Sequence, residues 1–355
     1  MFDPSSFLKR MLSLSGLSGY EGPAREVIAE TWRPLVDELA VSRLGSLHGL
    51  RRGEDSGARQ GPRPRIMIAA HMDAIGMMVT AVDQGLLRIT DVGGIDSRIL
   101  PGTLVTVHGR RDLPAVVVQP PDRLLPPAAR GKAVEMRYLL VDTGLLPEEV
   151  AQVVRVGDLV SFAQTPLELA GEVLAGHSID NRASVAALTY ALDELQRMRH
   201  TWDVWAVATV QEEVGLIGAA TSTFDIRPDI AVAIDVTFAR GPGAGDYRSH
   251  PFGKGIPLGW GPNIHPALYR AFRDLAEREE IPVRMDVMPR HSGTDAFAMQ
   301  VTAEGVPSMV LSIPIRYMHT PVEVVQIKDI RRVGQLLAAF IARLEPEFLD
   351  NIRWE

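Results

Sequence analysis

Short apolar runs alternate with helix-like segments at both ends of this chain, and that alternation constrains its fold more than any other feature. The run at 66–70 is apolar on both faces, as expected of a buried parallel strand. The pattern returns after residue 174, with apolar runs at 204–210, 230–234 and 309–313 and helix-like segments at 182–195, 267–279 and 327–344. Strands that alternate with helices predict an α/β domain with a mostly parallel central sheet and flanking helices.

The stretch from residue 76 to about residue 162 has a different character. Short segments rich in Val, Leu and Ile alternate there with Gly and Pro, and helix-like patterns are scarce. Such a stretch is typical of a small β-barrel or sandwich. We therefore predict a catalytic α/β domain formed by residues 1–72 and 164–355, interrupted by a β-rich, barrel-like domain formed by residues 73–163.

The composition excludes several classes of protein. Hydrophobic residues make up 46% of the 355 residues, enough for a buried core, but no run approaches the roughly 18 apolar residues that cross a bilayer. Because the chain has no cysteine, disulfides, thiolate metal sites and a cysteine nucleophile are ruled out, and we expect a cytoplasmic protein. The net charge of −7 and the lack of a long basic run argue against nucleic acid as a partner.

Acidic residues and histidines follow the predicted strands. In a parallel α/β sheet, reactive groups belong at the C-terminal ends of the strands. The residues in question are His71 and Asp73 after 66–70, Glu212 and Glu213 after 204–210, Asp235 after 230–234, His319 beyond 309–313, and Asp180 just before the helix at 182–195. We expect all of them at one rim of the sheet.

These side chains suit two divalent cations. Zinc binds imidazole nitrogen and carboxylate oxygen, and two ions about 3.5–4 Å apart need one bridging carboxylate. Asp180 can bridge, while His71 and Asp235 hold one ion and Glu213 and His319 hold the other. Zinc is the expected metal, with cobalt or manganese as alternatives.

Two carboxylates remain for other roles. Glu212 lies outside this ligand set, and beside a metal-bound water it is a natural general base. Asp73, two residues from His71, can accept the proton of the imidazole nitrogen that does not bind metal. We predict Glu212 and Asp73 as catalytic residues. Taken singly, each residue has a commoner structural interpretation, such as a helix N-cap for Asp180, and only their joint placement favours a metal site.

Several segments also match a family pattern in the same order. Residues 70–76 read AHMDAIG, residues 179–182 read IDNR and residues 211–219 read QEEVGLIGA, with further matching segments at 18–21, 233–236, 292–296 and 317–321. They resemble the corresponding segments of the glutamyl and tetrahedral (TET) aminopeptidases, metallopeptidase family forty-two. The sequence departs from the family pattern at Ala74, where Glu is usual, and at Asn181, where a second Asp is usual.

The resemblance implies an α/β dizinc exopeptidase domain interrupted by a β-rich dimerisation domain, with the ligands and general base named above. It also implies zinc or cobalt as the metal, a short peptide as the substrate, and a homo-oligomer whose dimers assemble into a dodecamer. We therefore expect a metal-dependent aminopeptidase that removes N-terminal residues with a two-metal activated water and a Glu general base.

Other functions stay open at this point. A dizinc N-acyl amino acid deacylase or carboxypeptidase-like hydrolase would share the ligands, and an endoglucanase-like glycosidase would need only two carboxylates. A protein that has the fold but no activity is a further alternative. The preferred N-terminal residue depends on loops such as 289–295 and 312–317, in which His291 and Arg316 are candidates to line the pocket.

Overall fold

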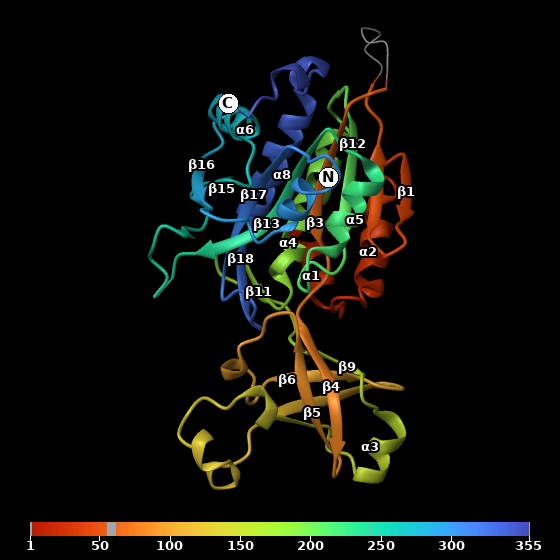
Figure 1. Ribbon diagram of the computed structural model, residues 1–355, viewed down its shortest axis with the longest axis vertical. Helices are drawn as coiled ribbons and strands as arrows, with labels where there is room; N and C mark the ends of the chain where they lie inside the picture. The colour runs from red at the N-terminus through yellow and green to blue at the C-terminus, as the bar shows by residue number, and fades with distance from the viewer. Residues whose placement is uncertain (1, 55–61, 242, 355) are drawn as a thin grey trace.

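The computed structural model describes residues 2–54, 62–241 and 243–354, which form a helix-covered sheet and, below it in Figure 1, a separate barrel. The predicted domain ranges also include residues 1, 55–61, 242 and 355, which lie outside the described part of the chain.

The main path of the large sheet has a parallel centre and antiparallel strands on both sides. Its main path runs β1 (Glu38–Val41), β2 (Leu47–Arg51), β12 (Asp203–Thr209), β3 (Arg65–His71), β13 (Ile230–Ala239), β17 (Ser308–Arg316), β18 (Glu323–Gln326), β11 (Val173–Gly176) and β10 (Leu167–Leu169). Off this path lie β14 (Ser249–His250), β15 (Ile256–Trp260) and β16 (Val283–Val287). Strands β12, β3, β13 and β17 are mutually parallel, so their C-terminal ends point to the same rim. The residues of β3 from Ile66 onward are buried, which explains its unbroken apolar run.

Helices cover both faces of this sheet (Figure 1). They are α1 (Pro4–Leu12), α2 (Gly22–Trp32), α4 (Ile179–Leu195), α5 (Ile217–Ile226), α6 (Pro266–Arg278), α7 (Asp295–Gln300) and α8 (Ile327–Ala342). Helix α4 packs against α1, α8, β3 and β13, while α5 and α7 pack against each other and against β3. Almost every residue of α4 is buried, as expected of a helix that neighbours enclose on all sides.

The predicted insert is a closed six-stranded barrel. Its strands follow the order β4 (Gly76–Asp83), β5 (Leu86–Val92), β8 (Leu140–Asp142), β7 (Asp112–Val118), β6 (Leu104–His108) and β9 (Leu159–Phe162). The short helices of this region are α3 (Pro147–Val153), η1 (Ser97–Ile99), η2 (Asp122–Leu124), η3 (Pro127–Ala129) and η4 (Met136–Tyr138), and η5 (Pro346–Asn351) lies near the C-terminus. Met77, Val107 and Val160 are fully buried in a core that belongs to the barrel alone. The structure thus confirms the predicted fold class, an α/β sheet domain with a barrel-like insert.

Two element boundaries differ from the prediction in ways that affect the site. Strand β13 runs on to Ala239, so Asp235 lies in the middle of a strand and not at its end. Helix α4 begins at Ile179, three residues early, so Asp180 lies in its first turn with non-helical dihedral angles of φ −74° and ψ 103°. Among the described residues, no helix combines the length and hydropathy that a membrane crossing requires.

Candidate metal centre

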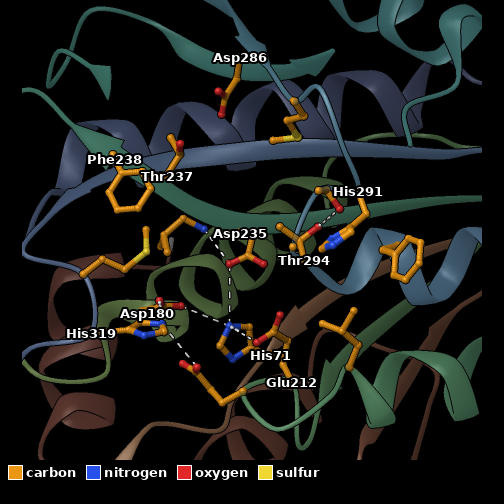
Figure 2. A pocket seen from close by; sticks show the side chains of 18 of the residues that line it. His71, Asp180, Glu212, Asp235, Thr237, Phe238, Asp286, His291, Thr294 and His319 are labelled. Atoms are coloured by element: carbon orange, nitrogen blue, oxygen red, sulfur yellow. Dashed lines mark hydrogen bonds and ion pairs between the residues drawn. The ribbon is translucent and has the colours of Figure 1, made fainter. Parts of the chain in front are cut away.

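His71, the last residue of β3, lies at the centre of a cluster of acidic side chains. Its ring is buried, and its Nε2 lies 3.3 Å from Oδ1 of Asp180, 3.8 Å from Oδ1 of Asp235 and 3.8 Å from Oε2 of Glu212. These residues come from four different segments of the chain that meet at the rim of the sheet (Figure 2). One imidazole nitrogen therefore faces three carboxylates at once.

Asp180 faces two imidazoles with its two carboxylate oxygens. Oδ1 lies 3.3 Å from Nε2 of His71, and Oδ2 lies 3.3 Å from Nε2 of His319. Nε2 of His319 also lies 3.4 Å from Oε2 of Glu213. A carboxylate with one oxygen toward each of two nitrogen donors has the geometry that a bridging ligand requires.

Hydrogen bonds to the carboxylate of Glu323 and to backbone carbonyls fix this part of the centre. The backbone N–H of Asp180 donates to Oε2 of Glu323 at 3.0 Å, and that of His319 donates to Oε1 of the same carboxylate at 2.8 Å. Nδ1 of His319 lies 3.0 Å from the carbonyl oxygen of Gly94, so a proton on Nδ1 leaves Nε2 free to bind metal. The residue after Asp180, Asn181, donates from Nδ2 to the carbonyl of Ile234 at 2.9 Å. Its amide is thus directed away from the acidic cluster.

Asp73 holds the turn that carries Glu212 and Glu213. Its Oδ1 and Oδ2 accept the backbone N–H groups of Glu212 and Glu213 at 3.1 Å and 3.2 Å, and Oδ2 also accepts the hydroxyl of Ser18 at 2.6 Å. Oδ1 lies 3.4 Å from Nδ1 of His71, near the predicted partner but without a hydrogen bond of good geometry. Asp73 therefore contacts both the ring of His71 and the turn after β12.

The acidic cluster is electrostatically unfavourable by itself. Burial, together with neighbouring Asp235, raises the pKa of Glu212 to about 10, and burial with neighbouring Asp180 raises the pKa of Glu213 to about 8. Burial also raises the pKa of Asp235 well above its ordinary value. At Asp180, hydrogen bonds with His319 and His71 outweigh burial and lower the pKa. Within the described chain, no lysine or arginine forms an ion pair with any of these four carboxylates.

The donors present fit divalent cations. Ligand atoms of His71, Asp180 and Glu213 lie within 4.8 Å of one another, and so do those of His71, Glu212 and Asp235. Imidazole nitrogen and carboxylate oxygen are the ligands that zinc takes when no thiolate is present. Buried carboxylates without lysine or arginine partners need protons or metal ions to offset their charge. Every ligand predicted from the sequence is thus found in one cluster, to which Glu212 also belongs.

A cavity of about 630 Å³ opens onto this cluster. Its wall includes His291 and Thr294 from the loop at 289–295, as predicted (Figure 2). Arg316 lies elsewhere, because its Nε donates to the carbonyl of Arg240 and its guanidinium lies over the ring of Phe252.

Two buried acidic residues beside the centre were not predicted from the sequence. Glu323 gives no signal in the sequence, because it follows a Pro-Val pair and no predicted strand. Its partners are the backbone N–H groups of His319, four residues before it, and of Asp180, 143 residues away. The other acid is Asp295, whose Oδ2 accepts the hydroxyl of Thr209 at 2.5 Å. It is the first residue of α7, whose N-cap is Thr294.

Comparison with known proteins identifies the family. The model of the M42 glutamyl aminopeptidase family matches residues 53–336. The chain is 34% identical over 350 residues to the lysyl aminopeptidase of Pyrococcus furiosus, covering 96% of this chain and 97% of that one. The TET aminopeptidase of Thaumarchaeota archaeon SCGC AB-539-E09 superposes with a TM-score of 0.91 at 30% identity, covering 99% of each chain. The TET1 peptidase of Pyrococcus horikoshii, described as assembling into a tetrahedron or a large octahedral shell, gives 0.83 at 30% identity, covering 96% of this chain and all of that one. The chain therefore belongs to the M42 glutamyl aminopeptidase family, a family of metallopeptidases, and is a peptide hydrolase of the aminopeptidase class.

Proposed function

We propose that this aminopeptidase removes the N-terminal residue of short peptides with a centre of two divalent cations. In this proposal Asp180 bridges the cations, His71 and Asp235 hold one of them, and Glu213 and His319 hold the other. The observation that carries it is the placement of the two oxygens of Asp180, each 3.3 Å from a different imidazole. Zinc fits the donor set, and cobalt and manganese are the alternatives.

The reaction needs a base, and we assign that role to Glu212. When bound, the cations supply Lewis acidity, which polarises the scissile carbonyl and makes water a stronger nucleophile. Glu212 lines the cavity beside His71, so its carboxylate can take a proton from the attacking water and return it to the leaving amine. Burial raises the pKa of Glu212 in the metal-free protein, so its carboxylate is a stronger base than an exposed one, and cations bound beside it would favour the ionised form that accepts the proton.

Asp73 acts through other residues. Its Oδ1 lies near Nδ1 of His71, so it orients the ring and directs Nε2 toward the acidic cluster. Asp73 also accepts hydrogen bonds from the backbone N–H groups of Glu212 and Glu213 and so fixes the turn that carries them. From this turn Glu212 would reach the water and Glu213 would reach the metal. We therefore propose Asp73 as a positioning residue for both sides of the centre.

We further propose that the protein is a cytoplasmic homo-oligomer whose barrels mediate dimerisation. The Pyrococcus horikoshii relative, which matches along 96% of this chain, is described as forming closed shells. A dodecamer built from dimers is the expected assembly, and light scattering coupled to size exclusion tests it directly.

Activity toward matched chromogenic substrates tests the proposed function. Protein stripped by a chelator and reloaded with Zn, Co or Mn should hydrolyse leucine p-nitroanilide and leave its N-acetylated equivalent intact, because an aminopeptidase recognises the free α-amine. Preferred hydrolysis of the acetylated substrate would instead favour the N-acyl deacylase. Cleavage of a glucan that survives the chelator would favour the glycosidase.

A further inference from the structure

Asp286 lines the same cavity as the metal centre but takes no part in it. Figure 2 shows its side chain on the side of the cavity opposite His71 and Asp180, with Asp235 between them. Its side chain is 6% exposed, so the carboxylate is buried apart from its opening to the cavity. The proposed mechanism gives this carboxylate no function.

The position of Asp286 is unusual for an acid. Within β16, all of which the structure describes, only Asp286 is buried, at a position where an apolar side chain would be ordinary. Among the described residues, its Oδ2 has no hydrogen-bond partner. Its Oδ1 lies 3.2 Å from Nε2 of His250, but that nitrogen also lacks a hydrogen bond of good geometry. A buried carboxylate so poorly paired is costly, which indicates that it awaits a partner from the cavity.

Part of the cavity wall is apolar. Val287, Met288, Phe238 and Phe297 line the cavity and can contact the methylene groups of a long side chain. Arg248 is the one guanidinium in the described wall, and its charge is already matched because it donates to Asp246 at 2.8 Å and 3.0 Å. A cavity wall that combines apolar side chains with a carboxylate whose Oδ2 lacks a hydrogen bond suits a side chain that is apolar along its stem and cationic at its tip.

We propose that Asp286 makes this cavity selective for peptides with an N-terminal lysine or arginine. The inference rests on the proposed function, because the metal centre must hold the α-amine and the scissile bond for the first side chain to enter the cavity. The ammonium or guanidinium then forms a charge-assisted hydrogen bond with Asp286, which supplies the partner that the carboxylate lacks. A neutral side chain of the same length leaves Oδ2 of Asp286 without a hydrogen bond.

The test compares lysine p-nitroanilide with norleucine p-nitroanilide, which has the lysine stem without the ammonium group. The readout is the ratio of kcat/KM for the two substrates, measured on the metal-loaded full-length chain. We expect the ratio to favour lysine by tenfold or more in the unaltered protein and to fall by at least tenfold in Asp286→Asn. Asp286→Glu, which keeps the charge, should retain a preference for lysine. The control Asp274→Asn removes an exposed carboxylate from α6 and should leave the ratio unchanged.

Three outcomes would overturn the inference. If the unaltered protein shows no preference for lysine over norleucine, His250 already neutralises Asp286. This outcome can be observed without making any variant. If Asp286→Asn lowers both rates equally, Asp286 is structural. If a glutamate substrate is preferred and Arg248→Gln abolishes that preference, the rim arginine sets the specificity. Failure to hydrolyse any aminoacyl substrate would refute the proposed function itself, and the assignment of Asp286 with it.

Discussion

Replacement of Glu212 by Gln isolates the proton-transfer step from the binding of metal. Gln has nearly the same size and shape, so the apolar and steric contacts of the side chain are kept. The backbone N–H of residue 212 still donates to Asp73 at 3.1 Å, so the turn after β12 is preserved. What the substitution removes is the ability of the side chain to accept a proton from water.

The expected loss of kcat follows from the role of Glu212 as a general base. General acid–base catalysis contributes about 10²–10⁴-fold in rate, which corresponds to about 3–5.5 kcal/mol of transition-state stabilisation. We expect kcat of Glu212→Gln to fall within this range while KM changes little, because the proposed ligands of both cations remain. Metal content should stay at two ions per chain.

Steady-state hydrolysis of leucine p-nitroanilide and metal analysis by mass spectrometry measure these two quantities. The matched control is Glu213→Gln, the same chemical change one residue away, which should lose one metal ion because Glu213 is a proposed ligand. If the Glu212→Gln variant keeps more than a tenth of the kcat of the unaltered protein, Glu212 is not the general base. Loss of an ion from that variant would make Glu212 a ligand instead, since its Oε2 lies as close to Nε2 of His71 as Asp235 does, at 3.8 Å.

Two further predictions concern the support of the centre and its charge. Glu323→Gln leaves one oxygen to accept the N–H groups of Asp180 and His319, so we expect metal affinity to fall about 10–100-fold in a metal titration; an unchanged affinity would contradict this role. Burial raises the pKa of Glu212 to about 10 and that of Glu213 to about 8 in the metal-free protein, from an ordinary 4.5. The folded metal-free chain therefore holds protons that the unfolded chain has released, and its stability should decrease as pH rises from about 5 toward 9. The melting temperature of metal-free protein should fall over this pH range, and that of metal-loaded protein should fall much less. Parallel curves of melting temperature against pH for the two forms would contradict this explanation.

Residues at strand ends were the most predictable part of the site. His71 ends β3, and its partner in the neighbouring parallel strand, Thr209, ends β12, so an apolar run followed by a polar residue marked the rim correctly. Asp235 shows the weakness of this rule. The segment after it, Val236 to Ala239, is β-branched or apolar, so the strand continues, and Asp235 is tolerated in its middle because it faces the cavity.

Contacts between side chains and distant backbone groups could not be predicted from the sequence. Glu323 is 143 residues from Asp180, and the carbonyl of Gly94 that lies against His319 comes from the barrel insert. Both contacts depend on how separate elements pack, which residue type and spacing do not specify. The same holds for Asp286. From the sequence, an acid in an edge strand is expected to be exposed to solvent, and only the structure shows that Asp286 is buried and lines the cavity.

Anomalous diffraction from crystals of the metal-loaded protein tests whether two cations share Asp180. We expect two peaks at the zinc absorption edge, about 3.5–4 Å apart, one beside each carboxylate oxygen of Asp180. One peak should lie near His71 and the other near His319. A single peak, or two peaks that do not share Asp180, would refute a two-cation centre at this site.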